Sequence, residues 1–219
     1  MNWGILFVGG LAVVALVLFF MVQLSPTPPG DVVPLVPGSI PGSEEQVITA
    51  VLPRSKNQPE GAVYSLDGWV LVNDFTTGFG ERRPILNREN SPGVFLDSTS
   101  NSLIFSVKTY GGVETILVEN IPAKKWIHFA IVVDQQAVHV YINGKLRQHH
   151  TLGQLPDLSD GPVVFGKGWD GVVGKVTFYA RSLTNMEVDK LSKQEPPDDL
   201  QRKPQAGGYF DLSWYLGRL

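Results

Sequence analysis

The stretch from Lys125 to Leu146, KWIHFAIVVDQQAVHVYINGKL, constrains the fold of this chain more than any other. It contains two apolar runs joined by a polar turn, and the second run ends at Asn143-Gly144. In that run Val138, Val140 and Ile142 alternate with other residues, so they share one side of an extended chain. Asn-Gly favours the positive φ angles of a tight hairpin turn. The stretch therefore predicts consecutive antiparallel strands in the middle of a sheet.

The chain beyond residue 61 has many short apolar runs separated by turn residues, which predicts an all-β fold, an antiparallel β-sandwich. One short helix is expected near its end, because Thr184 and Glu187 have the spacing of a capping box. Met186 and Leu191 are expected to pack this helix against the sheet edge. The predicted strands are Ala62–Asn73, Pro84–Arg88, Val94–Asp97, Leu103–Thr109, Glu114–Glu119, Trp126–Asp134, Ala137–Ile142, Leu146–Thr151, Val163–Phe165 and Gly171–Ala180.

Several of these segments carry a family signature. A W-x-H-x-A pattern begins at Trp126, and an apolar-x-apolar-Tyr-x-Asn-Gly-Lys run ends at Lys145. Val164-Phe165-Gly166, Asp170-Gly171 and the run from Val176 to Glu187 follow. In these residues the chain resembles the laminin-G-like branch of the concanavalin A-like lectin/glucanase superfamily. The resemblance implies a jelly-roll sandwich over residues 61–194, with sites at its rim that hold Ca²⁺ or sugar in relatives.

Composition excludes several classes of function. The 219 residues carry a net charge of −3, so no basic field indicates a nucleic-acid partner. Cysteine is absent, which excludes disulfides, a thiol nucleophile and thiolate metal sites. The sandwich must therefore be stabilised by its core alone.

The amino-terminal stretch from Trp3 to Leu24 is apolar, and no ionisable side chain occurs before Asp31. About 20 helical residues cross the hydrocarbon core of a bilayer, so residues 1–24 are predicted to form a single transmembrane α-helix. A cleaved signal peptide is the rival interpretation, but the stretch has no basic start and no small-x-small cleavage site. The side chains expected to contact the lipid bilayer are Trp3, Phe7, Leu11, Leu16, Phe19 and Phe20.

Two further segments flank the predicted sandwich. Residues 25–60 hold half of the chain's 16 prolines, which disfavours helix and predicts an extended stalk. Residues 195–219 form a tail that is expected either to fold back as a strand on its own sandwich or to dock on a neighbouring subunit. The large apolar side chains of this tail, which would make the docking contacts, are Tyr209, Phe210, Leu212, Trp214, Tyr215 and Leu216.

The sequence favours a body that is not an enzyme and needs no cofactor. Glycoside hydrolases of the resembled superfamily use an E-x-D-x-x-E pattern, whereas Glu187-Val-Asp189 is followed by Ser192 on a predicted helix. No zinc site is expected, because the four histidines lack the helical i, i+4 spacing with a carboxylate.

Rim sites for sugar or calcium are the remaining candidates. Trp169 is the best candidate for an exposed platform that binds a glycan, with Asp170 beside it, but packing in the core is the favoured interpretation of this side chain. Lys175 stands where family members often carry an acidic residue, which weighs against such a site. Calcium would need loop carboxylates. The candidates for calcium are Asp134, Asp157 and Asp160.

Three functions remain open. We favour a non-catalytic structural protein, anchored in the membrane by a single span, that links a bilayer to a protein shell or to neighbouring subunits. The second is a surface lectin that binds glycans through rim loops, and the third is a glycoside hydrolase. The plan also resembles laminin-G-like proteins of large DNA viruses with internal membranes. That resemblance implies a minor capsid protein at the interface of the internal membrane and the capsid of a virion.

Overall fold

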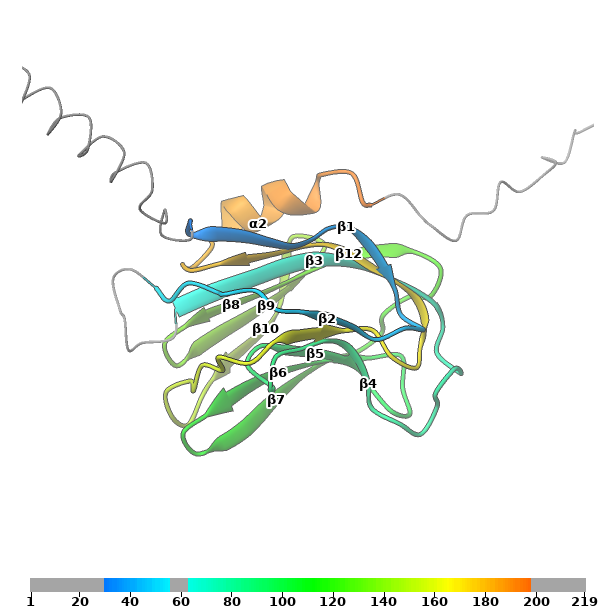
Figure 1. Cartoon of the computed structure of the whole chain (residues 1–219), viewed down its shortest axis with the longest axis horizontal. Helices are drawn as coiled ribbons and strands as arrows, with labels where there is room; N and C mark the ends of the chain where they lie inside the picture. The colour runs from blue at the N-terminus through cyan, green and yellow to red at the C-terminus, as the bar shows by residue number, and fades with distance from the viewer. Residues whose placement is uncertain (1–29, 56–62, 198–219) are drawn as a thin grey trace, which may run out of the picture. The chain divides into compact units, whose positions relative to one another are not determined.

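The computed structural model describes residues 30–55 and 63–197, which form two six-stranded antiparallel sheets packed face to face (Figure 1). The strands of sheet A, in spatial order, are β1 (Val32–Pro41), β12 (Asp170–Tyr179), β3 (Val63–Asp74), β8 (Trp126–Asp134), β9 (Ala137–Ile142) and β10 (Lys145–Thr151). The strands of sheet B, in spatial order, are β2 (Gln46–Ile48), β11 (Val163–Phe165), β4 (Arg83–Asn87), β5 (Gly93–Leu96), β6 (Leu103–Thr109) and β7 (Gly112–Val118). The predicted antiparallel β-sandwich is confirmed.

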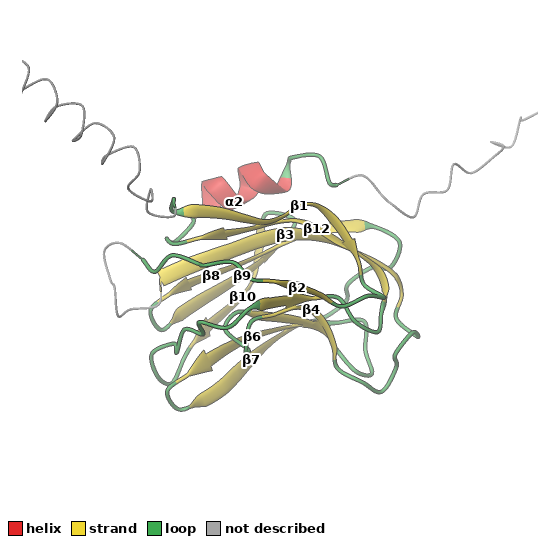
Figure 2. Cartoon of the chain, in the orientation of Figure 1, coloured by secondary structure: helices red, strands yellow, loops and turns green. Residues whose placement is uncertain are grey.

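The two sheets lie one above the other (Figure 2), and their inner faces share one apolar core. Because side chains alternate along a strand, every second residue enters it, and Val138 and Val140 of β9 are fully buried there. Phe105 of β6 meets Phe129 of β8 across the core, with ring centroids 6.3 Å apart. Contacts of this kind hold the two sheets together.

The hairpins predicted between Lys125 and Leu146 are confirmed. β8 pairs antiparallel with β9, and Phe129 lies opposite Ile142. Asn143 and Gly144 have φ angles of 51° and 76° and turn the chain from β9 into β10. The Asn143 side chain also accepts a hydrogen bond of 3.0 Å from the backbone N–H of His128.

The stalk predicted for residues 25–60 is wrong for the part of it that the structure describes. β1 pairs with β12 at one edge of sheet A, and β2 pairs with β11 at one edge of sheet B. Leu35, Val36 and Ile40, which lie between the prolines, are core residues. Proline is tolerated here because an edge strand leaves some of its N–H groups without a ladder partner, and the register is irregular next to Pro34. The sandwich therefore begins well before residue 61.

Helix α2 (Asn185–Ser192) lies over the outer face of sheet A (Figure 1). The predicted capping box is confirmed, because the Thr184 side chain accepts from the backbone of Glu187 and the Glu187 side chain accepts from the backbone of Thr184. Val188 is the fully buried contact of the helix. Leu191 is partly buried against the same cluster, whereas Met186 is 81% exposed, so its predicted packing contact is wrong.

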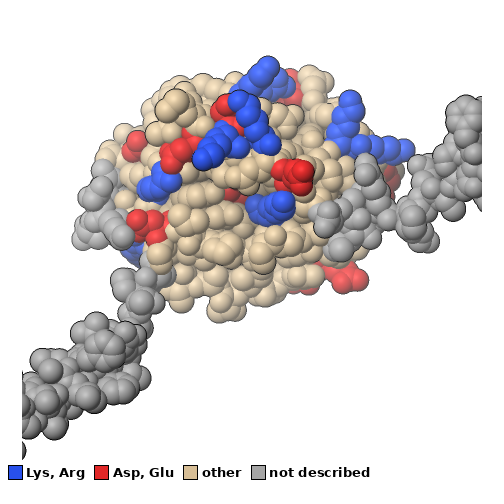
Figure 3. Space-filling model, turned by 90° about the horizontal axis from the view of Figure 1, so that it is seen from above, with Lys and Arg blue, Asp and Glu red and all other residues tan. Residues whose placement is uncertain are grey.

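Charged side chains of both signs are mixed on the face seen from above (Figure 3). Arg181 and Glu187 pair at 2.7 Å, and Lys193 pairs with Asp189 at 2.6 Å along α2. This face therefore presents no patch of a single charge.

No helix in the described ranges is long and apolar enough to cross a membrane. The predicted anchor, residues 1–24, lies outside the described residues. The same holds for the tail residues from Tyr209 to Leu216. Their predicted roles remain predictions.

Candidate functional site

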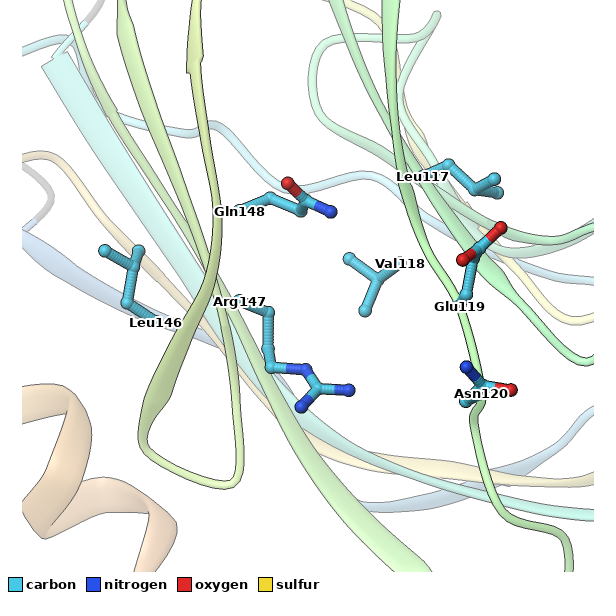
Figure 4. A pocket seen from close by; sticks show the side chains of 7 residues that line it. All are labelled: Leu117, Val118, Glu119, Asn120, Leu146, Arg147 and Gln148. Atoms are coloured by element: carbon cyan, nitrogen blue, oxygen red, sulfur yellow. The ribbon is translucent and has the colours of Figure 1, made fainter.

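A groove opens where β10 ends sheet A and β7 ends sheet B. It has a volume of about 560 Å³. Every residue of β10 is exposed except His150, as expected of a strand with one free edge. The groove is lined by Leu117, Val118, Glu119, Asn120, Leu146, Arg147 and Gln148 (Figure 4).

A hydrogen-bonded pair joins the two edge strands beside this groove. His150 Nε2 of β10 lies 2.8 Å from Glu114 Oε2 of β7, and the backbone N–H of Gly153 donates to Glu114 Oε1 at 2.9 Å. The bond from His150, with the amide of Gly153, holds the pKa of Glu114 below its ordinary value. This pair, which we call the edge clasp, fixes the spacing between the strands.

A β-bulge in β10 decides which of its side chains enter the groove. The register with β9 shifts by one residue between Leu146 and Gln148, so Arg147 is the extra residue. Beyond the bulge, Gln148 and His150 lie on the side of the strand that faces β7. Figure 4 shows the amide of Gln148 directed across the groove toward Leu117.

The lining combines hydrogen-bonding groups with apolar surface. Arg147 offers five N–H donors, and the amides of Gln148 and Asn120 both donate and accept. Glu119 is the single carboxylate among the lining residues, and none of them is aromatic. Leu117 and Leu146 on the two rims are 44% and 50% exposed, and Figure 4 shows their side chains directed away from the space between the strands, where Val118 is the apolar residue. The groove can therefore hold a ligand whose polar groups bond inside it and whose aliphatic parts pack on the rims.

Of the two interpretations of Trp169, packing in the core is confirmed and the exposed glycan platform is wrong. The side chain is 0% exposed, and its Nε1–H donates to the backbone oxygen of Pro84 at 3.0 Å. The ring packs so closely on Gly42 that a Cβ there would overlap it. Trp169 is thus a core residue, and neighbouring Asp170 accepts a hydrogen bond of 3.0 Å from Asn73.

The three carboxylates considered for calcium have separate surroundings. Asp157 pairs with Lys108 at 2.7 Å, and Asp160 pairs with Arg54 at 3.4 Å. Asp134 is exposed at the end of β8. Among the described residues, no three His, Cys, Asp or Glu side chains are grouped so that they could hold a metal ion.

His128 is a buried, hydrogen-bonded residue. Its Nε2 lies 3.1 Å from Asp67 Oδ2, and its ring packs edge-on against Trp69 with centroids 5.2 Å apart. Asp67 also lies near Tyr179, whose pKa is raised by burial first and then by the Asp67 charge. These polar residues lie on the outer face of sheet A.

The structure brings together two histidines that the sequence did not pair. His139 and His149 lie opposite each other on β9 and β10, with ring centroids 4.7 Å apart. In a regular hairpin closed by Asn143-Gly144, Gln148 would oppose His139 instead. The bulge at Arg147 changes that register, and no glycine marks it in the sequence. For the same reason the groove residues on β10 were not predicted.

Comparison with known proteins gives one family. A family model described as the concanavalin A-like lectin/glucanases superfamily, of the laminin G type, matches residues 47–189. No curated protein sequence matches this chain.

Receptor-binding domains of botulinum neurotoxins share the fold. That of botulinum neurotoxin D has a TM-score of 0.58 at 14% identity, over 71% of this chain and 43% of that chain. That of type G has a TM-score of 0.51 at 19% identity, over 71% and 45%. The binding domain of botulinum neurotoxin DC, in complex with rat synaptotagmin II, has a TM-score of 0.55 at 16% identity, over 74% and 45%. The match spans less than half of each of these chains, and the likeness concerns the fold alone.

Proposed function

We propose, since the chain belongs to the concanavalin A-like lectin/glucanase superfamily, that it is a non-catalytic binding module whose groove between β7 and β10 holds an extended segment of a partner protein. The observation that carries this proposal is the groove itself, where two edge strands flank polar side chains and carry half-exposed leucines on the rims. An extended segment matches this lining, because its amides can bond to the polar groups or to a strand edge while side chains that leave the groove pack on the leucines of the rims.

A protein partner is favoured over a glycan. The lining residues include no aromatic ring on which a sugar could stack. The binding domain of botulinum neurotoxin DC, which shares the fold, is in complex with a protein, rat synaptotagmin II. A glycan bound through Arg147 and Gln148 is the alternative, and a crosslinking experiment distinguishes it from a protein partner.

The proposal assigns no hydrolytic activity to the chain. Glu119 is the one carboxylate lining the groove, whereas glycoside hydrolysis needs a pair. Glu187, in the nearest match to the hydrolase pattern, accepts bonds from Arg181 and Thr184, which lower its pKa to about 2. A general acid needs a raised pKa, so Glu187 is unsuited to that role.

A membrane attachment completes the proposed function. The apolar stretch from Trp3 to Leu24 would anchor the module in a bilayer, and the aromatic tail from Tyr209 to Leu216 would hold a second partner or a neighbouring subunit. Such a protein would link a membrane to a protein shell, as a minor capsid protein does in a virion with an internal membrane. This part of the proposal depends on the sequence of the two ends.

Crosslinking from inside the groove tests the proposed partner. A photoreactive amino acid in place of Gln148, in the full chain in detergent, should crosslink one peptide sequence, whereas the same replacement at exposed Met186 should not. A synthetic copy of that peptide should bind at least tenfold more weakly to Arg147→Glu than to Met186→Glu. Equal binding to both variants would refute the groove, and a glycan-array signal lost in Arg147→Glu would replace the peptide by a sugar.

Alkaline extraction of membranes tests the anchor. The full chain should stay in the membrane pellet, and a chain that begins at residue 30 should move to the supernatant. Release of the full chain would contradict the anchor without bearing on the groove.

A further inference from the structure

Two histidines face each other on the outer face of sheet A, on the opposite side of that sheet from the groove. His139 of β9 lies directly across from His149 of β10 in the antiparallel register. Their ring centroids are 4.7 Å apart, and the ring planes are inclined by 45°. Residues opposite each other in an antiparallel pair share one face, with Cβ atoms about 4.5–5.5 Å apart, so both imidazoles can reach one point.

The bulge in β10 creates this pair and separates it from a third histidine. Because the register shifts at Arg147, His149 turns outward to meet His139. The next residue, His150, faces the other way and bonds to Glu114 at 2.8 Å in the edge clasp. Two of the three histidines on these strands therefore converge, and the third has a different partner.

The surroundings of the pair suit a cation. His149 is exposed and His139 is half-buried, so an ion can reach them from solvent. Asp134 of β8 lies on the same face, two residues beyond Val132, which is the direct neighbour of His139.

We propose that His139 and His149 together bind one divalent transition-metal ion of the zinc, nickel and copper class, with water in the remaining positions. At a metal–nitrogen distance of about 2.0–2.1 Å, two imidazoles on one ion have ring centres about 5 Å apart. The observed 4.7 Å fits this arrangement. Imidazole nitrogen suits these metals, whereas calcium prefers oxygen. Since no three potential ligands are grouped within the described ranges, the protein supplies two.

Metal titration of the full chain in detergent tests the site, with CuCl₂, NiCl₂ and ZnCl₂ as probes. One equivalent should bind per chain, with copper the tightest of the three. His139→Ala and His149→Ala should each weaken binding at least tenfold. His150→Ala is the matched control, because it removes a neighbouring histidine that faces away, and its affinity should equal that of the unmodified chain. An equal loss in all three variants, or full binding in His139→Ala, would overturn the proposal.

A spectroscopic measurement distinguishes the loss of a metal ligand from the misfolding of a variant. Electron paramagnetic resonance of the Cu²⁺ form should show coupling to two imidazole nitrogens in the unmodified chain and in His150→Ala, and to fewer in His139→Ala. Thermal unfolding of the metal-free variants should differ little, since both side chains reach the surface. A copper spectrum without nitrogen coupling in the unmodified chain would disprove the site.

Discussion

The outer faces of the two sheets differ in what covers them. Beneath α2, side chains of sheet A form a second apolar cluster with Leu183, Val188 and Leu191. Over the outer face of sheet B no described helix or strand lies (Figure 1). Both sheets come from similarly alternating sequences, and an eight-residue helix makes the difference between them.

The outer face of sheet A, which we call the covered face, buries polar groups. Asp67 and His128 are 4% and 0% exposed and lie 3.1 Å apart, so each satisfies part of the other's hydrogen-bonding capacity. A carboxylate removed from water needs such a partner, because leaving it unpaired costs free energy. The outer face of sheet A therefore contains buried polar groups that are paired with each other.

The outer face of sheet B, which we call the bare face, carries a row of apolar side chains instead. Phe95, Ile104 and Leu117 lie opposite one another across β5, β6 and β7. The guanidinium of Arg82 sits 3.8 Å above the ring of Phe95, and Leu117 at the end of the row is 44% exposed. Leu117 also lines the groove, so the bare face runs directly into the proposed binding site.

A substitution that detaches α2 from sheet A should have the largest effect on stability. Val188→Asp places a charge where the side chain is fully buried against sheet A, and we expect the free energy of unfolding to fall by about 3 kcal/mol or more. Met186→Asp, on the exposed side of the same helix, should change it by less than about 0.5 kcal/mol. Urea unfolding of both variants measures the difference. Equal effects would mean that α2 does not stabilise sheet A.

Breaking the buried pair of Asp67 and His128 should have the next largest effect on stability. Asp67→Ala leaves the Nε2 atom of His128 buried without its partner, so the free energy of unfolding should fall by about 2 kcal/mol. Ser106→Ala, which removes the hydrogen bond of 3.3 Å from the buried Ser106 hydroxyl to the backbone oxygen of Asn90 on the outer face of sheet B, should cost about 1 kcal/mol. Thermal and urea unfolding compare the two, and a larger loss for Ser106→Ala would reverse the contrast between the faces.

The sequence predicted the parts of the molecule that local patterns determine. The bounds of β6, β8, β9 and β11 agree with the predicted strands at both ends, because alternation and turn residues mark them. The capping box at Thr184 and Glu187 likewise predicted α2. β1 was missed because its prolines are typical of a linker, and only pairing with β12 shows that Leu35 and Val36 belong to the core.

The groove and the histidine pair could not be predicted in this way. Both depend on the bulge at Arg147 and on which strands end the sheets, and these are tertiary features. Trp169 is a similar case. The sequence left both an exposed platform and packing in the core open, and only the tertiary structure, with the hydrogen bond to Pro84, shows that the ring lies in the core.

Acid should weaken the covered face slightly. Arg181 and the Thr184 cap lower the pKa of Glu187 from 4.5 to about 2, so its stabilisation is present above pH 4.5 and is lost as the pH falls toward 2. Both partners are partly exposed to solvent, which limits the effect to less than about 1 kcal/mol. Glu187→Gln should flatten the decrease in unfolding free energy between pH 5 and 2.5. An unchanged slope would show that the pair does not contribute.

The smallest change in stability is expected on the bare face. Leu117→Glu replaces a side chain that is already 44% exposed, and the free energy of unfolding should change by less than about 0.5 kcal/mol. The same substitution replaces an apolar contact on the rim of the groove by a charged group, so it should weaken binding of the crosslinked peptide at least tenfold. Because a stability loss cannot explain weaker binding by a fully folded variant, urea unfolding and peptide affinity must be measured together. Unchanged affinity would show that the outer face of sheet B takes no part in binding. Weaker binding with unchanged stability would identify Leu117 as a contact residue.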